Sequence, residues 1–107
     1  MKIPSTAIVP PSKLTHYLLK PRAEDDKSKY LARGGFRIDA PEVLEAEIRR
    51  LSAETEAVLD DVREHGVYYT VTGQIVGPAK VALTVKLVWL LRVDGSFSFV
   101  TLVPRTK

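Results

Sequence analysis

Hydrophobic and polar residues follow two different periods along the chain, and the change comes at Gly66. Before it, apolar positions recur every three or four residues, which is typical of helices. After it, apolar and polar residues alternate, which is typical of strands with one buried side. The fold class expected is therefore α+β, with N-terminal helices packed on one face of an antiparallel β-meander of three to four strands.

The first part of the chain is expected to hold two short helices after an extended lead-in. Three prolines favour extended backbone over residues 1–11. Ser12 is a suitable N-cap for the first helix, which runs to Lys20 and ends before a proline. A second helix runs from about Asp25 to Arg33, with acids at its start and a cation at its end, as the helix dipole favours.

The strongest helical pattern lies between Asp39 and Gly66. Asp39 is followed by a proline and by an acid three residues after it, which together resemble a helix start. We expect one amphipathic helix from Ala40 to His65, either continuous or kinked near Ser52. Its stripe has spacings of 4, 3, 4, 3 and 4 and consists of Leu44, Ile48, Leu51, Thr55, Val58 and Val62.

An antiparallel sheet is expected in the remainder of the chain. Alternation is clear over 67–75 and most regular over 81–93. The Asp94-Gly95 dipeptide indicates a two-residue hairpin turn of type I′ into the last strand. The expected division of the single domain is a lead-in over 1–11, a helical part over 12–66 and a sheet over 67–104.

The hairpin turn also predicts which side chains share a face. It places Trp89 opposite Val100 and Val88 opposite Thr101, and the odd-numbered residues of neighbouring strands then line the core. The other side, which we call the open face, mixes hydroxyls, cations and aromatic rings, so we expect it to contact another molecule. A homo-oligomer interface and cover by the N-terminal segment are alternatives to a ligand. The expected open-face residues are Tyr68, Thr70, Thr72, Gln74, Thr84, Lys86, Val88, Arg92, Phe97, Phe99 and Thr101.

Composition narrows the class of protein. A chain of 107 residues, 45% hydrophobic and 27% charged, suits one globular domain rather than a disordered chain. The absence of cysteine excludes a disulfide scaffold, a thiolate zinc site and a cysteine nucleophile, and it fits a reducing compartment. The longest apolar run, Leu87 to Leu91, is too short to span a membrane. We therefore expect a cytoplasmic protein without a membrane partner.

The net charge of +3 is unevenly distributed along the chain. Residues 1–37 carry a net charge of +5, residues 38–66 carry −6, and residues 67–107 carry +4. Basic blocks suit an anionic partner such as RNA, and the acidic block suits a basic protein partner.

Metal-independent RNA cleavage is the enzyme class that the chemistry-bearing residues best support. His16 and His65 have no metal-ligand spacing, and no nucleophile elbow or phosphate loop is present, so no metal or cofactor is expected. RNA cleavage needs an acid or base near the 2′-oxygen and cations near the phosphate. His16 shares one predicted helical face with Lys13 and Lys20. Further cations are expected on the next helix and on the open face.

Several short motifs resemble an uncharacterised bacterial family of about 100 residues. They are Lys13-Leu-Thr-His-Tyr-Leu-Leu19, Lys27-Ser-Lys29, Gly35-Phe36, Tyr69, Gly77-Pro78, Val88-Trp89, Val100-Thr101 and Pro104. That family, a domain of unknown function, is similar to the toxin nuclease superfamily that groups barnase, EndoU, colicin and RelE. The resemblance implies N-terminal helices before an antiparallel sheet, metal-independent RNase activity, and a toxin–antitoxin context for some members.

The resemblance also implies roles for individual residues. It places Lys13, Lys29 and Thr101 in or near the site, and it makes Tyr17, Phe36 and Trp89 structural. One departure is the loop over residues 21–26, which reads Pro-Arg-Ala-Glu-Asp-Asp where related sequences often have a His-Pro or glycine-containing loop.

The combined prediction is a toxin-like RNase domain. Three residues are expected to be catalytic, namely His16, Lys29 and Thr101. Six cations are expected to bind the substrate, namely Lys13, Lys20, Lys27, Arg33, Lys86 and Arg92. The expected partners are RNA, an antitoxin-like protein, or a second copy through the open face. The alternatives are a non-catalytic binding or self-assembling module and a passive nucleic-acid binder.

Overall fold

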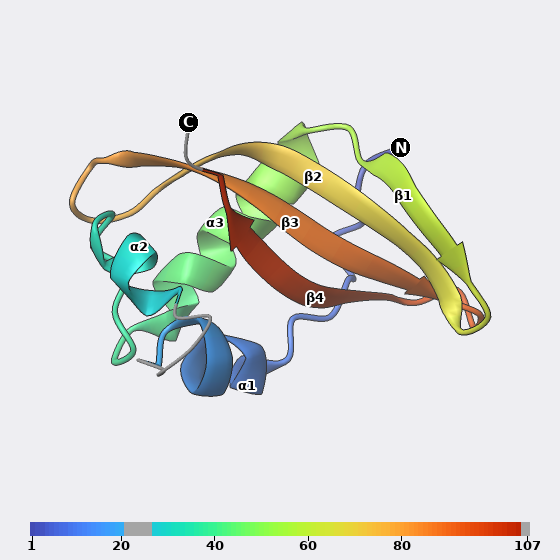
Figure 1. Cartoon of the computed structure of the whole chain (residues 1–107), viewed down its shortest axis with the longest axis horizontal. Helices are drawn as coiled ribbons and strands as arrows, with labels where there is room; N and C mark the ends of the chain where they lie inside the picture. The colour runs from blue at the N-terminus through green and yellow to red at the C-terminus, as the bar shows by residue number, and fades with distance from the viewer. Residues whose placement is uncertain (21–26, 106–107) are drawn as a thin grey trace.

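Four antiparallel strands in sequential order form one sheet, and helical segments precede them in the computed structural model, which describes residues 1–20 and 27–105. Figure 1 shows α3 crossing behind the sheet and α1 lying below the edge formed by β4. The α+β class is confirmed. The elements are α1 (Pro11–Lys13), the π-helix η1 (Leu14–Leu18), α2 (Ser28–Ala32), α3 (Pro41–Glu54), β1 (Val58–Arg63), β2 (Gly66–Val76), β3 (Ala82–Arg92) and β4 (Phe97–Pro104).

The first two helices differ from their predicted bounds. The first begins at Pro11, because the fixed φ of proline suits the first helical position, so the prediction of Ser12 as N-cap is wrong. Over Leu14–Leu18 the helix widens into a π-helix, a geometry that often occurs at functional sites. The second helix spans Ser28–Ala32. Its predicted start near Asp25 lies outside the described residues.

The predicted helix from Ala40 to His65 is wrong beyond Glu54. There α3 ends, and after a short link β1 pairs antiparallel with β2 through a two-residue turn at Glu64-His65. Val58 and Val62 fit a helical stripe by spacing, but valine is also favoured in strands, and β2 supplies the backbone hydrogen bonds. The sheet therefore begins nine residues earlier than the predicted start at residue 67.

The core lies between the helices and one side of the sheet. Trp89 is almost fully buried, and its indole Nε1–H donates to the Oγ of Ser52 on α3 at 3.1 Å, so the one polar atom of the ring is satisfied. The predicted parity of β2 and β3 is confirmed, because Tyr69 faces Trp89 and Val71 faces Leu87. The predicted core residues that are fully buried are Val71, Leu83, Val85, Leu87, Trp89 and Leu102.

The turn between β3 and β4 is longer than the two residues predicted. The N–H of Gly95 donates to the carbonyl of Arg92 at 3.0 Å, and the N–H of Arg92 donates to the carbonyl of Ser96 at 2.8 Å. Gly95 has a φ of +92°, whereas Asp94 has no positive φ, so the turn is not type I′. This pattern is a three-residue loop closed by glycine in the left-handed region. The longer loop shifts the adjacent pairing by one residue, so that Trp89 faces Phe99.

A bulge at Val100 restores the predicted register further along β4. Beyond it Val88 faces Thr101, as predicted. Phe99 and Thr101 are two residues apart and would share a face in a regular strand. Because Val100 is the extra residue, Phe99 points into the core with 1% exposure while Thr101 stays on the open face. The predictions that Phe97 and Phe99 lie on the open face are therefore wrong.

Glu47, in the middle of α3, pairs with Arg50 of the same helix and also fastens the helix to the end of β2. Glu47 accepts hydrogen bonds from the Arg50 guanidinium at 3.0 Å and from the backbone N–H of Val76 at 2.8 Å. The Arg50 hydrogen bond, opposed by partial burial, holds the pKa of the Glu47 carboxyl below its ordinary value. The ionised form of Glu47 is therefore the one that the fold stabilises.

This pair predicts a loss of stability in acid. The lowered pKa of Glu47 contributes stability above the pKa of the unfolded carboxyl, about 4.5, and that contribution disappears as the pH falls through the lower folded pKa. Glu47→Gln should reduce the free energy of unfolding at pH 7 by about 1 kcal/mol and flatten its decline between pH 5 and 3. Urea unfolding across this range measures both effects. Glu42→Gln, at an exposed position on the same helix, is the control, and an equal effect of both variants would contradict the assignment.

Candidate functional site

Lys27 is the most unusual side chain on the β4 side of the molecule. It is a lysine with 8% exposure, and it precedes the first residue of α2. Its Nζ donates to the Oγ1 of Thr101 at 3.0 Å and to the hydroxyl of Tyr17 at 3.3 Å, and it lies 5.0 Å from the centre of the Tyr17 ring. Lysine is rarely buried unless it is paired with an anion. Among the residues that the structure describes, no carboxylate forms an ion pair with it.

The three residues of this cluster come from three separate elements of the chain. Tyr17 comes from the π-helix, where the wider turn changes the direction of the side chains. Lys27 comes from the start of α2, which is anchored by fully buried Leu31 and by the hydroxyl of Tyr30, which donates to the carbonyl of Thr84 at 2.8 Å. Thr101 comes from β4 and reaches the open face because of the bulge. We call Tyr17, Lys27 and Thr101 the lysine cluster.

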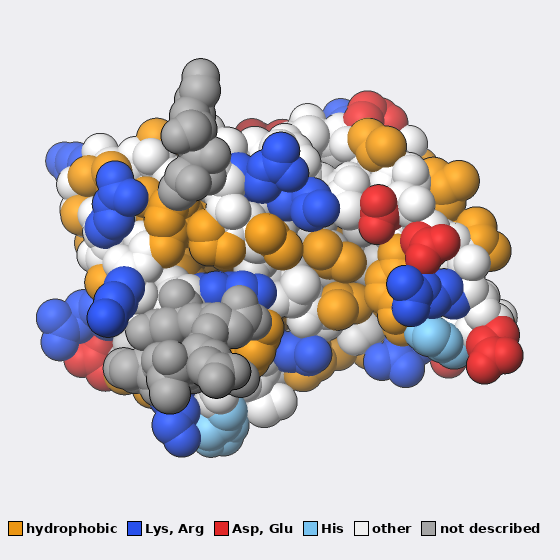
Figure 2. Space-filling view, in the orientation of Figure 1, with side chains coloured by type: hydrophobic (Ala, Val, Ile, Leu, Met, Phe, Trp, Pro, Cys, Tyr) orange, Lys and Arg blue, Asp and Glu red, His pale blue; other side chains and the backbone are white. Residues whose placement is uncertain are grey.

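The open face beside the lysine cluster carries hydroxyls and a further cation. Val88 lies opposite both Thr101 and Thr70, and Lys86 lies opposite Thr72, so these residues occupy two adjacent rows across the strands. Figure 2 shows this face: Lys and Arg side chains lie over its left and central parts and also at its right-hand end, around a hydrophobic band, and Asp and Glu gather mainly toward that right-hand end. The acidic side chains visible on this face are therefore concentrated toward one end, whereas the basic ones are spread along it.

Two of the predicted site residues meet in the structure. Lys27 was expected to bind substrate and Thr101 to be catalytic, and they are hydrogen-bonded to each other. Lys86 is half-buried on the open face near them, and Arg92 is exposed toward the hairpin end of the same face. Lys13 is half-buried.

In the described part of the chain, the other predicted residues form no hydrogen bond with Thr101. Within 1–20 and 27–105, His16 is exposed next to Tyr17, and Lys20 is exposed at the end of the same segment. Arg33 is exposed, and its guanidinium lies 5.6 Å from the centre of the Tyr30 ring. Lys29 is exposed and lines a separate groove of about 370 Å³, together with Leu19, Phe36, Arg37 and Asp39.

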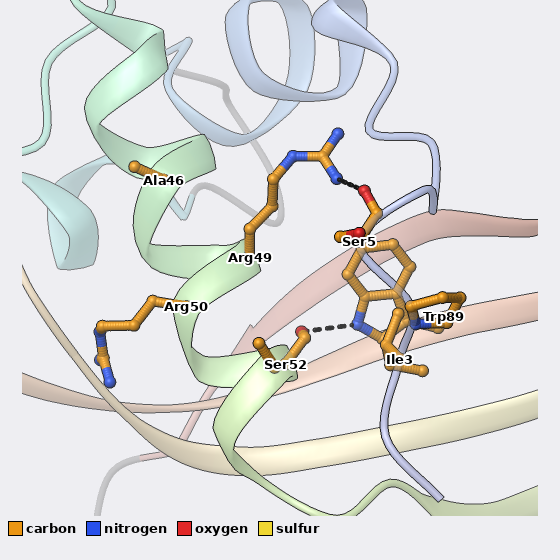
Figure 3. Close-up of a pocket in the computed structure, with 9 residues that line it drawn as sticks. Ile3, Ser5, Ala46, Arg49, Arg50, Ser52 and Trp89 are labelled. Carbon is orange, nitrogen blue, oxygen red and sulfur yellow. Dashed lines mark hydrogen bonds between the residues drawn. The ribbon is translucent and has the colours of Figure 1, made fainter.

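A second pocket, of about 250 Å³, lies on the opposite side of the sheet (Figure 3). Ile3 of the N-terminal segment and Trp89 of β3 contribute its apolar wall. Its two cations are already neutralised: Arg49 binds Glu45 and the backbone carbonyls of Ser5 and Ala7, and Arg50 binds carboxylates of its own helix. An anion would therefore gain less here than at Lys27.

From the sequence, Tyr17 was not predicted as a site residue, and Lys27 was not distinguished from the other cations. The sequence Lys27-Ser-Lys29 shows two lysines near the start of a helix, and only one of them can point toward the sheet. No signal in the sequence distinguishes the two, because the direction depends on how α2 docks against β3 and β4.

Two further findings concern membrane-spanning helices and metal binding. In the part of the chain that the structure describes, no helix has the length and apolar character needed to cross a membrane. Within the same residues, His, Asp and Glu side chains form no group of three or more that would suit a metal ion. The N-terminal segment lies along the outer edge of β4, where Ile8 pairs with Ser98.

Comparison with protein-family models gives one match, to the domain of unknown function DUF6883, over residues 2–106. The chain belongs to the DUF6883 family. This confirms membership of a domain of unknown function. Comparison with curated protein sequences gives no match.

Among solved structures, this DUF6883 domain is similar to a chain of a contact-dependent growth inhibition toxin–immunity protein complex from Klebsiella pneumoniae 342. The TM-score is 0.73, the sequence identity is 17%, and the match covers 94% of this chain and 95% of that chain. At this identity the likeness shows a shared fold.

Proposed function

We propose that this DUF6883 domain is a toxin-like, metal-independent endoribonuclease with its active centre at the lysine cluster. The observation that carries the proposal is the buried ammonium of Lys27, held by two neutral hydroxyls on a face rich in cations and hydroxyls. A phosphodiester of RNA is the anion that this surface would bind.

The energetics of burial support an anionic ligand. An ammonium removed from water costs several kcal/mol unless an opposite charge or strong hydrogen bonds compensate for it. The hydroxyls of Tyr17 and Thr101 compensate only in part, because they carry no charge. A phosphate oxygen at Lys27 would supply, through a short, charge-assisted hydrogen bond, the negative charge that no carboxylate of the described residues supplies.

The chemistry proposed is transfer of the phosphodiester to the neighbouring 2′-oxygen. The O2′–P bond forms and the P–O5′ bond breaks, which leaves a 2′,3′-cyclic phosphate and a free 5′-hydroxyl. Lys27 and the hydroxyl of Thr101 stabilise the negative charge that develops on the non-bridging oxygens. No metal takes part in this scheme.

Two protons must move in this reaction. In our proposal His16 accepts the proton of the 2′-hydroxyl, since its imidazole is exposed, it adjoins Tyr17 in the chain, and histidine is the commonest general base. Tyr17 donates a proton to the leaving 5′-oxygen, because its hydroxyl lies beside the Lys27 ammonium that binds the phosphate. Exchange with water restores both groups.

The remaining predicted cations are proposed to hold the rest of the RNA chain. Lys86 and Arg92 would contact phosphates on the open face, and the other cations would do so along the helices beside β4. These helical cations are Lys13, Lys20, Lys29 and Arg33.

A protein inhibitor is the second partner that we propose. The structural neighbour comes from a toxin–immunity protein complex, and an antitoxin-like protein would suit a toxin that must be silent in its own cell. Self-association through the open face has less support, because the phenylalanines expected there are buried. The RNA target and this inhibitor both place the protein's action in the cytoplasm.

Cleavage of RNA without metal tests the proposal. The purified chain should cleave single-stranded RNA in excess EDTA, and the products should carry 2′,3′-cyclic phosphate ends, detected by mass spectrometry. A DNA oligonucleotide of the same sequence is the matched control and should stay intact, since it lacks the 2′-hydroxyl. No cleavage of any RNA at micromolar protein, together with normal growth of cells that express the chain, would contradict the proposal.

A further inference from the structure

Lys86 and Thr72 form the row of open-face residues next to the row that holds Thr101 of the lysine cluster. We infer that they form a second phosphate subsite, which binds the phosphate adjacent to the one cleaved. This inference rests on the proposed function and deepens it, because it defines the substrate as a single strand with at least two phosphates on the open face.

The strand register sets the spacing of the two subsites. Thr101 faces Val88, and Lys86 is two residues from Val88 on the same strand and the same face. Residues two apart on a strand are separated by about 6.6 Å, and a diagonal pair across two strands by about 7–8 Å. Thr101 and Lys86 form such a diagonal pair. This separation matches one nucleotide step of an extended single strand.

The surroundings of Lys86 favour an anion. The side chain is half-buried, and none of the carboxylates in the described ranges forms an ion pair with it. Thr72 lies directly opposite on β2 and contributes a hydroxyl to the same row. A phosphate there would accept hydrogen bonds from both side chains, in the way that another phosphate does from Lys27 and Thr101.

The open-face position next to both subsites is held by the apolar Val88. Val88 occupies the row of Thr101, between Thr101 and Thr70, and it is half-buried. A sugar bridging the two phosphates would therefore contact an apolar side chain and the hydroxyl of Thr70. In this arrangement the two ammonium groups bind successive phosphates of one RNA strand, and the hydroxyls beside them contact the sugars.

Binding of short analogues tests the subsite independently of cleavage. The probes are 2′-O-methyl dinucleoside monophosphates, which have no free 2′-hydroxyl to attack the phosphate, with and without one additional terminal phosphate on either end. In NMR titrations the additional phosphate should tighten binding to the unmodified protein by about tenfold, the gain expected for a charged hydrogen bond. Lys86→Met should lose that gain and keep the affinity for the probe without the additional phosphate.

Lys80→Met is the matched control. It removes one positive charge from an exposed position six residues before Lys86, in the turn that precedes β3. This variant should retain the tenfold gain. An equal loss in both variants, or a loss of affinity for the two probes alike in Lys86→Met, would overturn the subsite.

Kinetics with cleavable RNA separate this inference from the proposed function. Lys86→Met should raise KM for a phosphate-extended dinucleotide about tenfold and leave kcat unchanged. Absence of cleavage by the unmodified protein would refute the ribonuclease proposal, whereas the binding of the 2′-O-methyl probes would still decide the subsite.

Discussion

Lys27→Met is expected to lower the rate of RNA cleavage by about 10²- to 10³-fold, which is the usual cost of removing one group that stabilises transition-state charge. The methylene groups of methionine can fill the same partly apolar space, and the variant no longer buries an ammonium. Its free energy of unfolding should therefore be unchanged or higher. Single-turnover kinetics and urea unfolding measure the two effects.

Lys20→Met is the control for this experiment. It removes the same charge from an exposed position on the segment that carries Tyr17, so it should weaken RNA binding slightly and leave the chemical step intact. Equal losses in the two variants would show that Lys27 contributes only general positive charge. If Lys27→Met lowered the free energy of unfolding enough to account for its loss of activity, Lys27 would have a structural role.

Phe99→Ala is expected to reduce the free energy of unfolding by about 3–5 kcal/mol, the range for deleting a buried aromatic ring. Phe99 has 1% exposure, and its ring packs edge-on against Trp89 with centroids 5.4 Å apart. On the open face, where the regular register would place it, the same substitution would cost far less. Urea unfolding of this variant therefore tests the bulge itself.

Val100→Ala supplies the comparison for Phe99→Ala. Val100 is the half-buried extra residue of the bulge, and its truncation should cost about 1 kcal/mol. A cost for Phe99→Ala no greater than that for Val100→Ala would contradict the register. The same bulge turns Thr101 toward Lys27, so the stability of Phe99 and the geometry of the lysine cluster depend on one feature of β4.

The parts of the fold that were predicted correctly depend on local periodicity. Alternation over 67–75 and 81–93 correctly predicted β2 and β3, because a slip of one residue would move every side chain of a strand to the other face. The end of the third helix was wrong, because Val58 and Val62 satisfy both periods and only the pairing of β1 with β2 decides between them.

The candidate site was less predictable than the fold. The sequence identified a group of cations and a threonine on the open face, and Lys27 and Thr101 do meet. It did not distinguish Lys27 from Lys29, which lines a different groove. Burial of one lysine and exposure of the other follow from how α2 docks, which no local pattern encodes.

The sequence by itself determined the change from helices to an antiparallel sheet, the strands β2, β3 and β4, the central register of the sheet and the polarised charge of the chain, because these depend on residues close together along the chain. Only the tertiary structure decided the three-residue turn, the bulge at Val100 and the burial of Lys27. The burial of Lys27 depends on contacts with the π-helix and β4, and the turn and the bulge depend on how β4 pairs with β3, so in each case packing between elements overrides local preference. The proposed activity depends on that second set of features.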